Sequence, residues 1–276
     1  MTRSDTRPLS VLTIAGSDSG GGAGIQADLK TFAAHGVHGV CAIAALTAQH
    51  TRGVMAVHVP SVAFLRAQID ACFDDFRISV VKLGMLANIE VITAVADALE
   101  HHQPSHIVLD PVMVATSGAR LLEADALDAL CARLIPLATI LTPNIPEAEL
   151  LLGHPIADDA AADAALAELL ARGARAMLLK GGHLQGSAAM IDRYYDGHTR
   201  AGFAHERLDV EGHGTGCTLA AAIAAQLCLG MPLRAACEAA TDYVHGALRH
   251  ATRPGRSLMA VLDHFWQSPV VPPISG

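Results

Sequence analysis

The feature that most constrains the fold is an alternation between short apolar runs and longer segments with helical periodicity. The apolar runs are VLTIA (11–15), HGVCAIAAL (38–46), ISVVKLG (78–84), HIVLD (106–110), ATILT (138–142) and AMLLKG (176–181). Their nearly continuous hydrophobicity predicts strands that are buried on both faces. Because such strands alternate with helical segments, the sequence predicts a doubly wound α/β fold with a mostly parallel sheet flanked by helices.

The segments between these runs carry signals for helix starts and for one hairpin. We expect helices to begin after Gly24, Ser61, Asn88, Glu123, Pro146, Asp159 and Gly216, with Ser61 and Asp159 as N-caps. The segment 188–210 instead alternates around Asp196-Gly197, a dipeptide typical of hairpin turns. A small antiparallel part is therefore expected at one edge of the sheet.

Length and composition favour one soluble domain. The chain has 276 residues, of which 51% are hydrophobic, enough for one large core. We expect a single domain over residues 1–276, with its core at about 11–250 and a tail at 251–276. The first ten residues lack the apolar stretch of a signal peptide, and no apolar run reaches the roughly 20 residues that span a bilayer. The expected location is the cytoplasm.

Charge and cysteine spacing exclude several classes of function. The formal net charge is −8 and lysines and arginines do not cluster, so neither nucleic acid nor an anionic membrane has an electrostatic footprint. The six cysteines show no C-x-x-C spacing, which favours reduced thiols over a disulfide framework or a zinc site. Chemistry on a small molecule is favoured.

Polar residues follow the predicted strands, where open α/β sheets bind their ligands. They are Gly16, Asp18, Thr47, Gln49, Met85, Asp110, Asn144, Glu147 and Lys180, together with the loop 212–217. Glycines, carboxylates, an amide, a lysine and a helix start at one edge indicate a site that handles phosphate.

Two glycine-rich loops compete for the phosphate. The first, AGSDSGGGAGIQAD (15–28), loosely fits a dinucleotide fingerprint, but no acidic residue between Asp28 and Asp70 could hold a ribose. A Walker A motif is absent from the sequence. The second loop, 212–217, fits an anion better, because it precedes a helix of small residues whose first N–H groups are free. An ordinary turn before a core helix remains the alternative.

The ordered motifs resemble those of the hydroxymethylpyrimidine/phosphomethylpyrimidine kinases of thiamine biosynthesis, in the ribokinase superfamily. The resemblance runs from about residue 11 to 248 through AGSDSGGGAGIQADLKTF, ALTAQHTRGV, VKLGMLA, DPVMVATSG, LTPNIPEAELLLG, LLKGGH and GHGTGCTLAAAIAA. It implies a ribokinase-like fold, ATP and Mg²⁺ as cofactors, and a homodimer. It also implies that the first glycine loop closes around a small pyrimidine while ATP lies at the later loops.

The resemblance assigns roles to individual residues. Substrate contacts fall to Gly16, Asp28, Gln49, Met85 and Val112. Nucleotide contacts fall to Asn144, Lys180, Thr215 and Gly216, metal binding through water to Asp110 and Glu147, and catalysis to Lys180, Gly214, Gly216 and Cys217.

Some of these residues also suit their roles chemically. The Gln49 amide offers a donor and an acceptor to an aminopyrimidine edge. Cys217 opens a helix, so we expect its pKa to be lowered and its thiolate to act as general base. From the residues alone, Gln49 is more often a loop residue that makes hydrogen bonds, and Asp28 is alternatively a first-turn carboxylate and Met85 a gap-filler. We expect His183, Asp192, Tyr195, Asp196 and His213 to be structural.

The resulting hypothesis is ATP-dependent phosphorylation of 4-amino-5-hydroxymethyl-2-methylpyrimidine and of its monophosphate, which gives the pyrimidine diphosphate. The alternative is a pyridoxal-type kinase of the same fold, whose substrate also carries a hydroxymethyl group. An NAD(P) oxidoreductase is disfavoured by the missing ribose acid. A non-catalytic pyrimidine-binding module is disfavoured by Lys180 and the anion loop.

Overall fold

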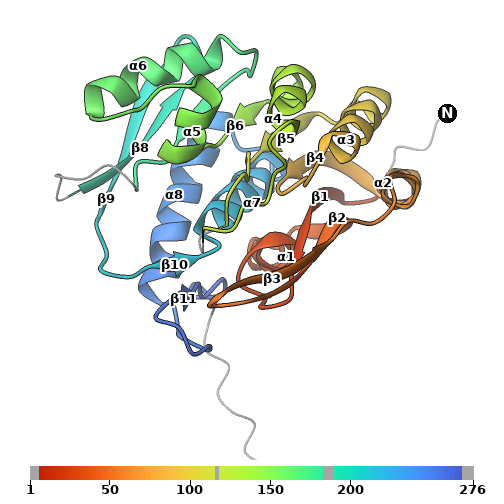
Figure 1. The fold of residues 1–276 in the computed structure, drawn as a ribbon, viewed down its shortest axis with the longest axis horizontal. Helices are drawn as coiled ribbons and strands as arrows, with labels where there is room; N and C mark the ends of the chain where they lie inside the picture. Colours follow the sequence, from red (N-terminus) through yellow and green to blue (C-terminus); the bar gives the residue numbers. More distant parts are fainter. Residues whose placement is uncertain (1–5, 116–117, 183–188, 269–276) are drawn as a thin grey trace, which may run out of the picture.

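The computed structural model describes residues 6–115, 118–182 and 189–268, which form a layered α/β fold around one large sheet (Figure 1). The strand order is β3 (Gly53–His58), β2 (His38–His50), β1 (Leu9–Asp18), β4 (Arg77–Leu83), β5 (His106–Leu109), β6 (Ile140–Leu141), β7 (Met177–Leu179), β8 (Ala189–Tyr195) and β9 (Arg200–Glu206). Strands β2, β1, β4, β5, β6 and β7 run parallel. The predicted doubly wound fold is confirmed.

Helices cover both faces of the sheet. One face packs against α1 (Gly24–Ala34), α7 (Thr215–Cys228) and α8 (Leu233–Arg249). The other packs against α2 (Val62–Asp75), α3 (Ile89–His102), α4 (Ala126–Ala129), α5 (Ile145–Leu152) and α6 (Asp159–Leu170). Strand β1 shows why. Val11 packs in the core on the side of α1, α7 and α8, whereas Leu12 and Ile14 pack in the core on the opposite side. A strand with apolar residues on both sides must be covered twice.

The predicted start signals largely operate as expected. The Ser61 hydroxyl accepts from the Phe64 N–H, and the Asn88 side chain caps α3 in the same way. The predicted cap at Asp159 was wrong by one residue. Asp158 has the extended backbone of an N-cap, and its carboxylate accepts from the Ala161 N–H at 2.8 Å, so Asp159 is already helical.

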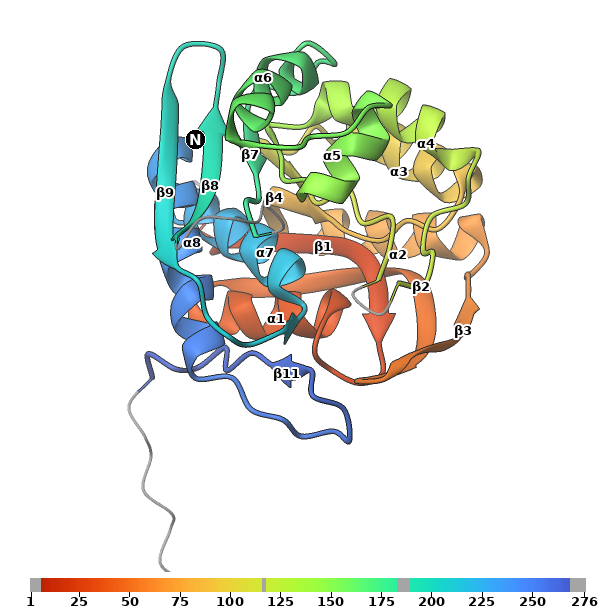
Figure 2. The ribbon, with the colours of Figure 1, turned by 60° about the vertical axis from the view of Figure 1, so that its left-hand side comes forward.

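The β8–β9 hairpin confirms the expected antiparallel edge (Figure 2). The carboxylate of Asp196 accepts from the N–H groups of His198 and Thr199, and Gly197 has φ +87°. A second antiparallel strand, β3, lies at the opposite edge beside β2, where none was expected. Its residues are mostly exposed, so β3 lacks the buried apolar run by which the other strands are recognised.

The C-terminal part contains a helix and a small strand pair that were not predicted from the sequence. Helix α8 packs against α7, and β10 (Gly212–His213) pairs with β11 (Ala260–Val261) from the tail. Tyr243 of α8 donates its hydroxyl proton to the His264 carbonyl at 2.6 Å, so the described part of the tail packs on the domain. The six cysteines are free thiols.

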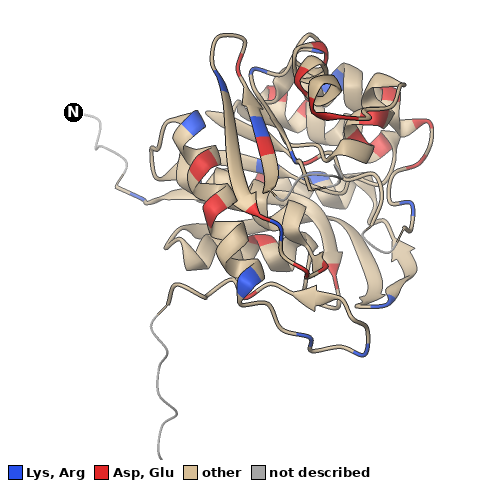
Figure 3. Ribbon diagram, turned by 90° about the vertical axis from the view of Figure 1, so that its left-hand side faces the viewer, with Lys and Arg blue, Asp and Glu red and all other residues tan. Residues whose placement is uncertain are grey.

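The charged residues are interspersed along the chain (Figure 3). Both basic and acidic residues occur on the side shown in Figure 3. Among the described residues, no helix has both the length and the apolar character that crossing a membrane requires.

Candidate active site

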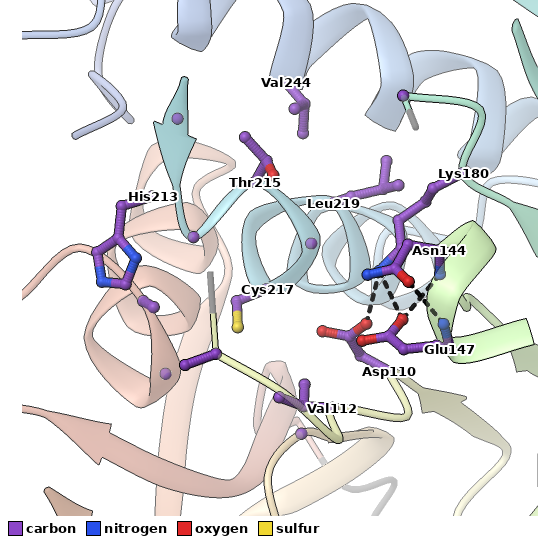
Figure 4. A pocket seen from close by; sticks show the side chains of 18 of the residues that line it. Asp110, Val112, Asn144, Glu147, Lys180, His213, Thr215, Cys217, Leu219 and Val244 are labelled. Carbon is purple, nitrogen blue, oxygen red and sulfur yellow. Dashed lines mark hydrogen bonds and ion pairs between the residues drawn. The ribbon is translucent and has the colours of Figure 1, made fainter. Parts of the chain in front are cut away.

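A cavity of about 550 Å³ lies at the carboxyl ends of the parallel strands. It is lined by Gly16, Gln49, Met85, Asp110, Val112, Asn144, Glu147 and Lys180 from the predicted set, and by Gly214, Thr215, Gly216 and Cys217 from the start of α7. Figure 4 shows His213 on one side of Cys217 and the Lys180 cluster on the other. Of the predicted site residues, only Asp28 does not line this cavity.

Lys180 follows β7 and joins two carboxylates across the sheet edge. Its Nζ lies 3.0 Å from Asp110 Oδ1 after β5 and 3.6 Å from Glu147 Oε2 in α5. Burial acts to lower the pKa of Lys180, but the charges of Asp110 and Glu147 outweigh it and hold that pKa above its usual range. The ammonium therefore stays charged at the cavity lining, beside Asp110 and Glu147.

Asn144 and Glu147 form a capping box at the start of α5. The Asn144 side-chain oxygen accepts from the Glu147 N–H at 2.8 Å, and the Glu147 carboxylate accepts from the Asn144 N–H at 2.8 Å. Burial raises the pKa of Glu147 to about 7, with the Lys180 ammonium acting in the opposite direction. One hydrogen-bond pattern therefore ends the loop, starts the helix and aims the carboxylate at Lys180.

Two glycines of the second loop lie at close contacts, and at Gly214 the contact is with backbone, which requires glycine. Gly214 has φ +84°, and a Cβ there would lie 1.9 Å from the Gly22 carbonyl oxygen. A Cβ on Gly216 would lie 2.9 Å from Lys180 Nζ. The first turn of α7 has N–H groups without acceptors in the helix, so it faces the cavity as an anion site next to the ammonium.

Cys217 lies in that first turn, but its acidity differs from the expectation. Burial raises its pKa to about 11, against the lowering effects of Lys82 and of the Gly24 N–H. The predicted lowering of this pKa at the helix start was wrong, because loss of hydration outweighs the dipole and the nearby ammonium. At neutral pH the side chain is a thiol.

The first glycine loop is organised by Asp18. Its carboxylate accepts from the N–H groups of Gly20 at 2.8 Å, Gly22 at 3.0 Å and Ala23 at 2.9 Å. His213 Nε2 lies 2.9 Å from the same carboxylate. The loop therefore wraps an internal anion and touches the second loop through His213.

Gln49 and Met85 form the cavity wall at this end. The Gln49 amide lies between Thr47 Oγ1, 3.1 Å from its oxygen, and His213 Nε2, 3.3 Å from its nitrogen. Met85 is buried, and a Cβ on Gly16 would lie 3.0 Å from its sulfur. Glycine at position 16 therefore leaves room for the thioether at the cavity surface.

Asp28 lies behind this wall. It is fully buried, accepts from the Thr13 hydroxyl at 2.6 Å, and pairs with Lys82 Nζ at 2.9 Å. The structure thus places Lys82, not Asp28, at the cavity. The sequence offered a signal that was not used, since Lys82 is charged within the apolar run ISVVKLG and must be paired if buried.

Other polar residues divide between the cavity and the scaffold. His213, expected to be structural, lines the cavity, and so does Asp192, whose carboxylate accepts from the Gly181 N–H at 2.8 Å. Asp196 closes the hairpin turn, and the Tyr195 ring lies under the Arg200 guanidinium, as expected of scaffold residues. His183 lies outside the described residues.

Comparisons with known proteins show the family of the chain. A family model described as phosphomethylpyrimidine kinase matches residues 18–261. The chain is 52% identical over 262 residues to the hydroxymethylpyrimidine/phosphomethylpyrimidine kinase of Rhizobium meliloti (strain 1021), covering 93% of this chain and 98% of that protein.

Two solved structures extend the similarity to the fold. The phosphomethylpyrimidine kinase of Clostridium difficile 630 is 40% identical with a TM-score of 0.77, covering 86% of this chain and 97% of that one. The pyridoxal kinase of Staphylococcus aureus in complex with AMP-PCP and pyridoxal is 29% identical with a TM-score of 0.87, covering 96% of each chain.

Proposed function

The chain belongs to the phosphomethylpyrimidine kinase family, and from this premise we propose that it transfers the γ-phosphoryl group of ATP to 4-amino-5-hydroxymethyl-2-methylpyrimidine and to its monophosphate. These reactions give the pyrimidine diphosphate of thiamine biosynthesis. One observation carries the proposal: a single cavity joins an amide suited to an aminopyrimidine, at Gln49, to an ammonium and a helix start suited to phosphate.

The pyrimidine end is built from Gly16, Gln49, Met85 and Val112. A Gln amide presents one acceptor and two donors, so it pairs with an amino group and an adjacent ring nitrogen. The Met85 thioether packs favourably on an aromatic ring. Asp28 contributes indirectly, because its ion pair at 2.9 Å fixes Lys82 at the cavity.

The phosphate end is built around Lys180. Its retained charge suits the ATP phosphates, with Asn144, Thr215 and Gly216 as further contacts. Asp110 and Glu147 fit a Mg²⁺ ion that keeps most of its water, because they supply two hard oxygen donors near the phosphate end. No cluster of three metal-ligating side chains exists within the described ranges, so a fully protein-coordinated ion does not fit there. Bound Mg²⁺ would neutralise charge on the phosphates.

The transfer step relies on positioning and on charge stabilisation. The N–H groups of residues 214–217 at the start of α7 would face a bound phosphate, and together with Lys180 they would stabilise negative charge on the transferring group. Cys217 lies between the two ends of the cavity, where it would receive the hydroxymethyl proton. A pKa of about 11 means that the thiol must first lose its own proton, so we assign the larger effect to the N–H groups and Lys180.

The pyridoxal-type alternative shares the fold and the phosphate end, since one similar structure is a pyridoxal kinase bound to pyridoxal. Gln49 favours the aminopyrimidine, because its paired donor and acceptor match an amino group beside a ring nitrogen. This preference concerns only the pyrimidine end of the cavity.

A coupled ADP-release assay tests the proposal, with the aminopyrimidine alcohol, its monophosphate and pyridoxal compared side by side. We expect turnover of the first two, with kcat/KM for the alcohol at least about tenfold above that for pyridoxal. The Lys180→Ala variant serves as the control for contaminating kinases. Exclusive turnover of pyridoxal would replace the proposal by the alternative, and no turnover of any of the three would refute both.

We also infer a cytoplasmic homodimer made of single-domain subunits. Exposed apolar side chains of β2, β3 and α2 support the dimer, because Leu46, Met55, Val57 and Phe64 are each more than one-third exposed. Consumption of ATP supports the location. Sedimentation of the wild-type protein and of the Met55→Asp/Phe64→Asp variant tests the dimer, which the variant should dissociate. Cell fractionation tests the location.

A further inference from the structure

The contact between His213 and Gln49 contains a conflict of donors that bears on substrate selection. His213 Nε2 lies 2.9 Å from Asp18 Oδ2 and 3.3 Å from the Gln49 amide nitrogen. A single ring nitrogen either carries a proton and donates or lacks one and accepts. It cannot donate to Asp18 and accept from Gln49 at the same time, so one of the two neighbours determines its state.

Asp18 determines whether His213 Nε2 carries a proton. The carboxylate accepts three backbone N–H groups, from Gly20, Gly22 and Ala23, which favour its ionised form. Burial opposes ionisation, but these bonds and His213 prevail and hold the pKa of Asp18 below its usual range. A carboxylate at 2.9 Å requires a proton on His213 Nε2. That nitrogen is therefore a donor, and it faces the amide of Gln49.

Thr47 is the other neighbour of the Gln49 amide, and the single proton of its hydroxyl determines whether it donates to the amide or accepts from it. The Thr47 hydroxyl has one proton, which it donates to the Ser17 carbonyl oxygen at 2.9 Å. Its lone pairs remain for the Gln49 amide, which lies 3.1 Å away. A half turn of the amide removes the conflict, because its nitrogen then donates to Thr47 while its oxygen faces the His213 N–H. That oxygen is the second, longer acceptor of a bifurcated hydrogen bond whose first acceptor is Asp18.

We propose that His213, anchored by Asp18, fixes the direction of the Gln49 amide and so makes the cavity select a ring edge with an amino group beside an unprotonated nitrogen. With one lone pair and one N–H used by His213 and Thr47, the other lone pair and the other N–H of the amide remain for the ligand. The lone pair accepts from an amino group, and the N–H donates to the ring nitrogen. His213 is a positioning residue, and its effect rests on the proposed function.

The position of His213 is itself tightly held. Its side chain is 10% exposed, and a Cβ on Gly22 would lie 2.5 Å from the imidazole Cδ2. The ring therefore packs directly against the backbone of the first glycine loop. The donor that the Gln49 amide faces is thus held in place by packing as well as by its hydrogen bond to Asp18, as precise selection requires.

The test compares two substrates that differ only in this edge. The 4-oxo analogue of the pyrimidine alcohol carries an acceptor in place of the amino group and an N–H in place of the ring nitrogen. If the Gln49 amide is fixed, its N–H faces the ring N–H of the oxo analogue and its oxygen faces the oxo group, so neither contact is a hydrogen bond. Wild-type kcat/KM should therefore favour the amino compound by at least about 100-fold. This ratio does not report general damage, because such damage lowers both values together.

Three variants and one control are measured. His213→Leu keeps the side-chain volume but removes the N–H, and should lower the amino-to-oxo ratio at least about tenfold. His213→Gln keeps an N–H at similar reach and should retain the ratio, while Thr47→Val should lower it less than His213→Leu. His154→Leu removes an exposed histidine remote from the cavity lining and should change nothing. An unchanged ratio in folded His213→Leu would overturn the proposal.

A second measurement requires no variant. Nitrogen-15 NMR of histidine-labelled wild-type protein reports whether His213 Nε2 carries a proton. A protonated Nε2 is expected, and an unprotonated Nε2 would overturn the proposal even if His213→Leu failed to fold. Failure of the proposed function is distinct, because it would appear as wild-type protein that does not turn over the aminopyrimidine at all.

Discussion

The raised pKa of Cys217 predicts slow exchange of this thiol with an aromatic disulfide. Its pKa of about 11, compared with an ordinary 9.0, lowers the thiolate population about 100-fold at neutral pH. The more basic thiolate is intrinsically more nucleophilic by roughly tenfold, which offsets part of this loss. The net expectation is exchange about tenfold slower than that of the same cysteine in the unfolded chain, before any hindrance from the cavity walls.

The assay follows the Cys217 peptide by mass spectrometry after timed exposure to the reagent. Urea-unfolded protein provides the matched reference, because it contains the same peptide with a fully hydrated thiol. Between pH 7 and 9.5 the rate in the folded protein should rise about tenfold per pH unit without levelling off. Hindrance alone would reduce the rate without changing this slope. A plateau below pH 8, or exchange faster than in the unfolded chain, would show that the thiol is acidic and refute the argument.

Four further outcomes follow from the site. Gln49→Ala should leave the protein folded and lower kcat/KM for the aminopyrimidine at least about 100-fold, measured by ADP release, whereas a change confined to ATP affinity would contradict its placement. Lys180→Ala should weaken MgATP binding in calorimetry while pyrimidine binding persists, and normal MgATP affinity would count against the phosphate end. Lys82→Met should lower the free energy of unfolding in urea by about 3–5 kcal/mol, because it strands the buried Asp28 carboxylate, and Lys82→Met/Asp28→Asn should recover part of the loss. Glu147, with its pKa raised to about 7, binds more protons in the folded state between about pH 4.5 and 7, so its contribution to stability declines as pH rises through this range. Urea unfolding at several pH values should therefore show a flatter profile for Glu147→Gln, and identical profiles would contradict the raised pKa.

The parallel part of the fold was predictable because each of its strands is recognisable from its own apolar residues. Strands such as β1 and β4 are buried on both faces, so their hydrophobicity is visible without knowledge of their neighbours. Strand β3 is exposed, and its pairing depends on β2 rather than on its own residues. Helix α8 has a mixed composition and is recognised only by the face that it packs on α7.

The site was predictable as a set of positions but not in its couplings. Residues that follow parallel strands must meet at one edge, which brings Asp110, Asn144 and Lys180 together whatever their side chains do. The partnership of Asp28 with Lys82 depends on how helix α1 packs against strand β4, which a linear pattern does not contain. The acidity of Cys217 depends on its burial near groups that are distant in the sequence, such as Lys82 and Asp110, and this burial outweighs its position at a helix start.

The division of the helices between the two faces of the sheet sets an order of events during synthesis. Strands β1 to β6 and helices α2 to α5 lie within the first 152 residues, so most of one core can assemble while the chain is still emerging from the ribosome. The opposite face, with Val11, Val80 and Val108, has only α1 to cover it until residues 215–249 appear. A nascent chain of intermediate length therefore presents a broad apolar surface, the kind that chaperones bind. The same late segment contains the helix start at the phosphate end of the cavity. A chain released before α7 is made would therefore be prone to aggregation and lack kinase activity.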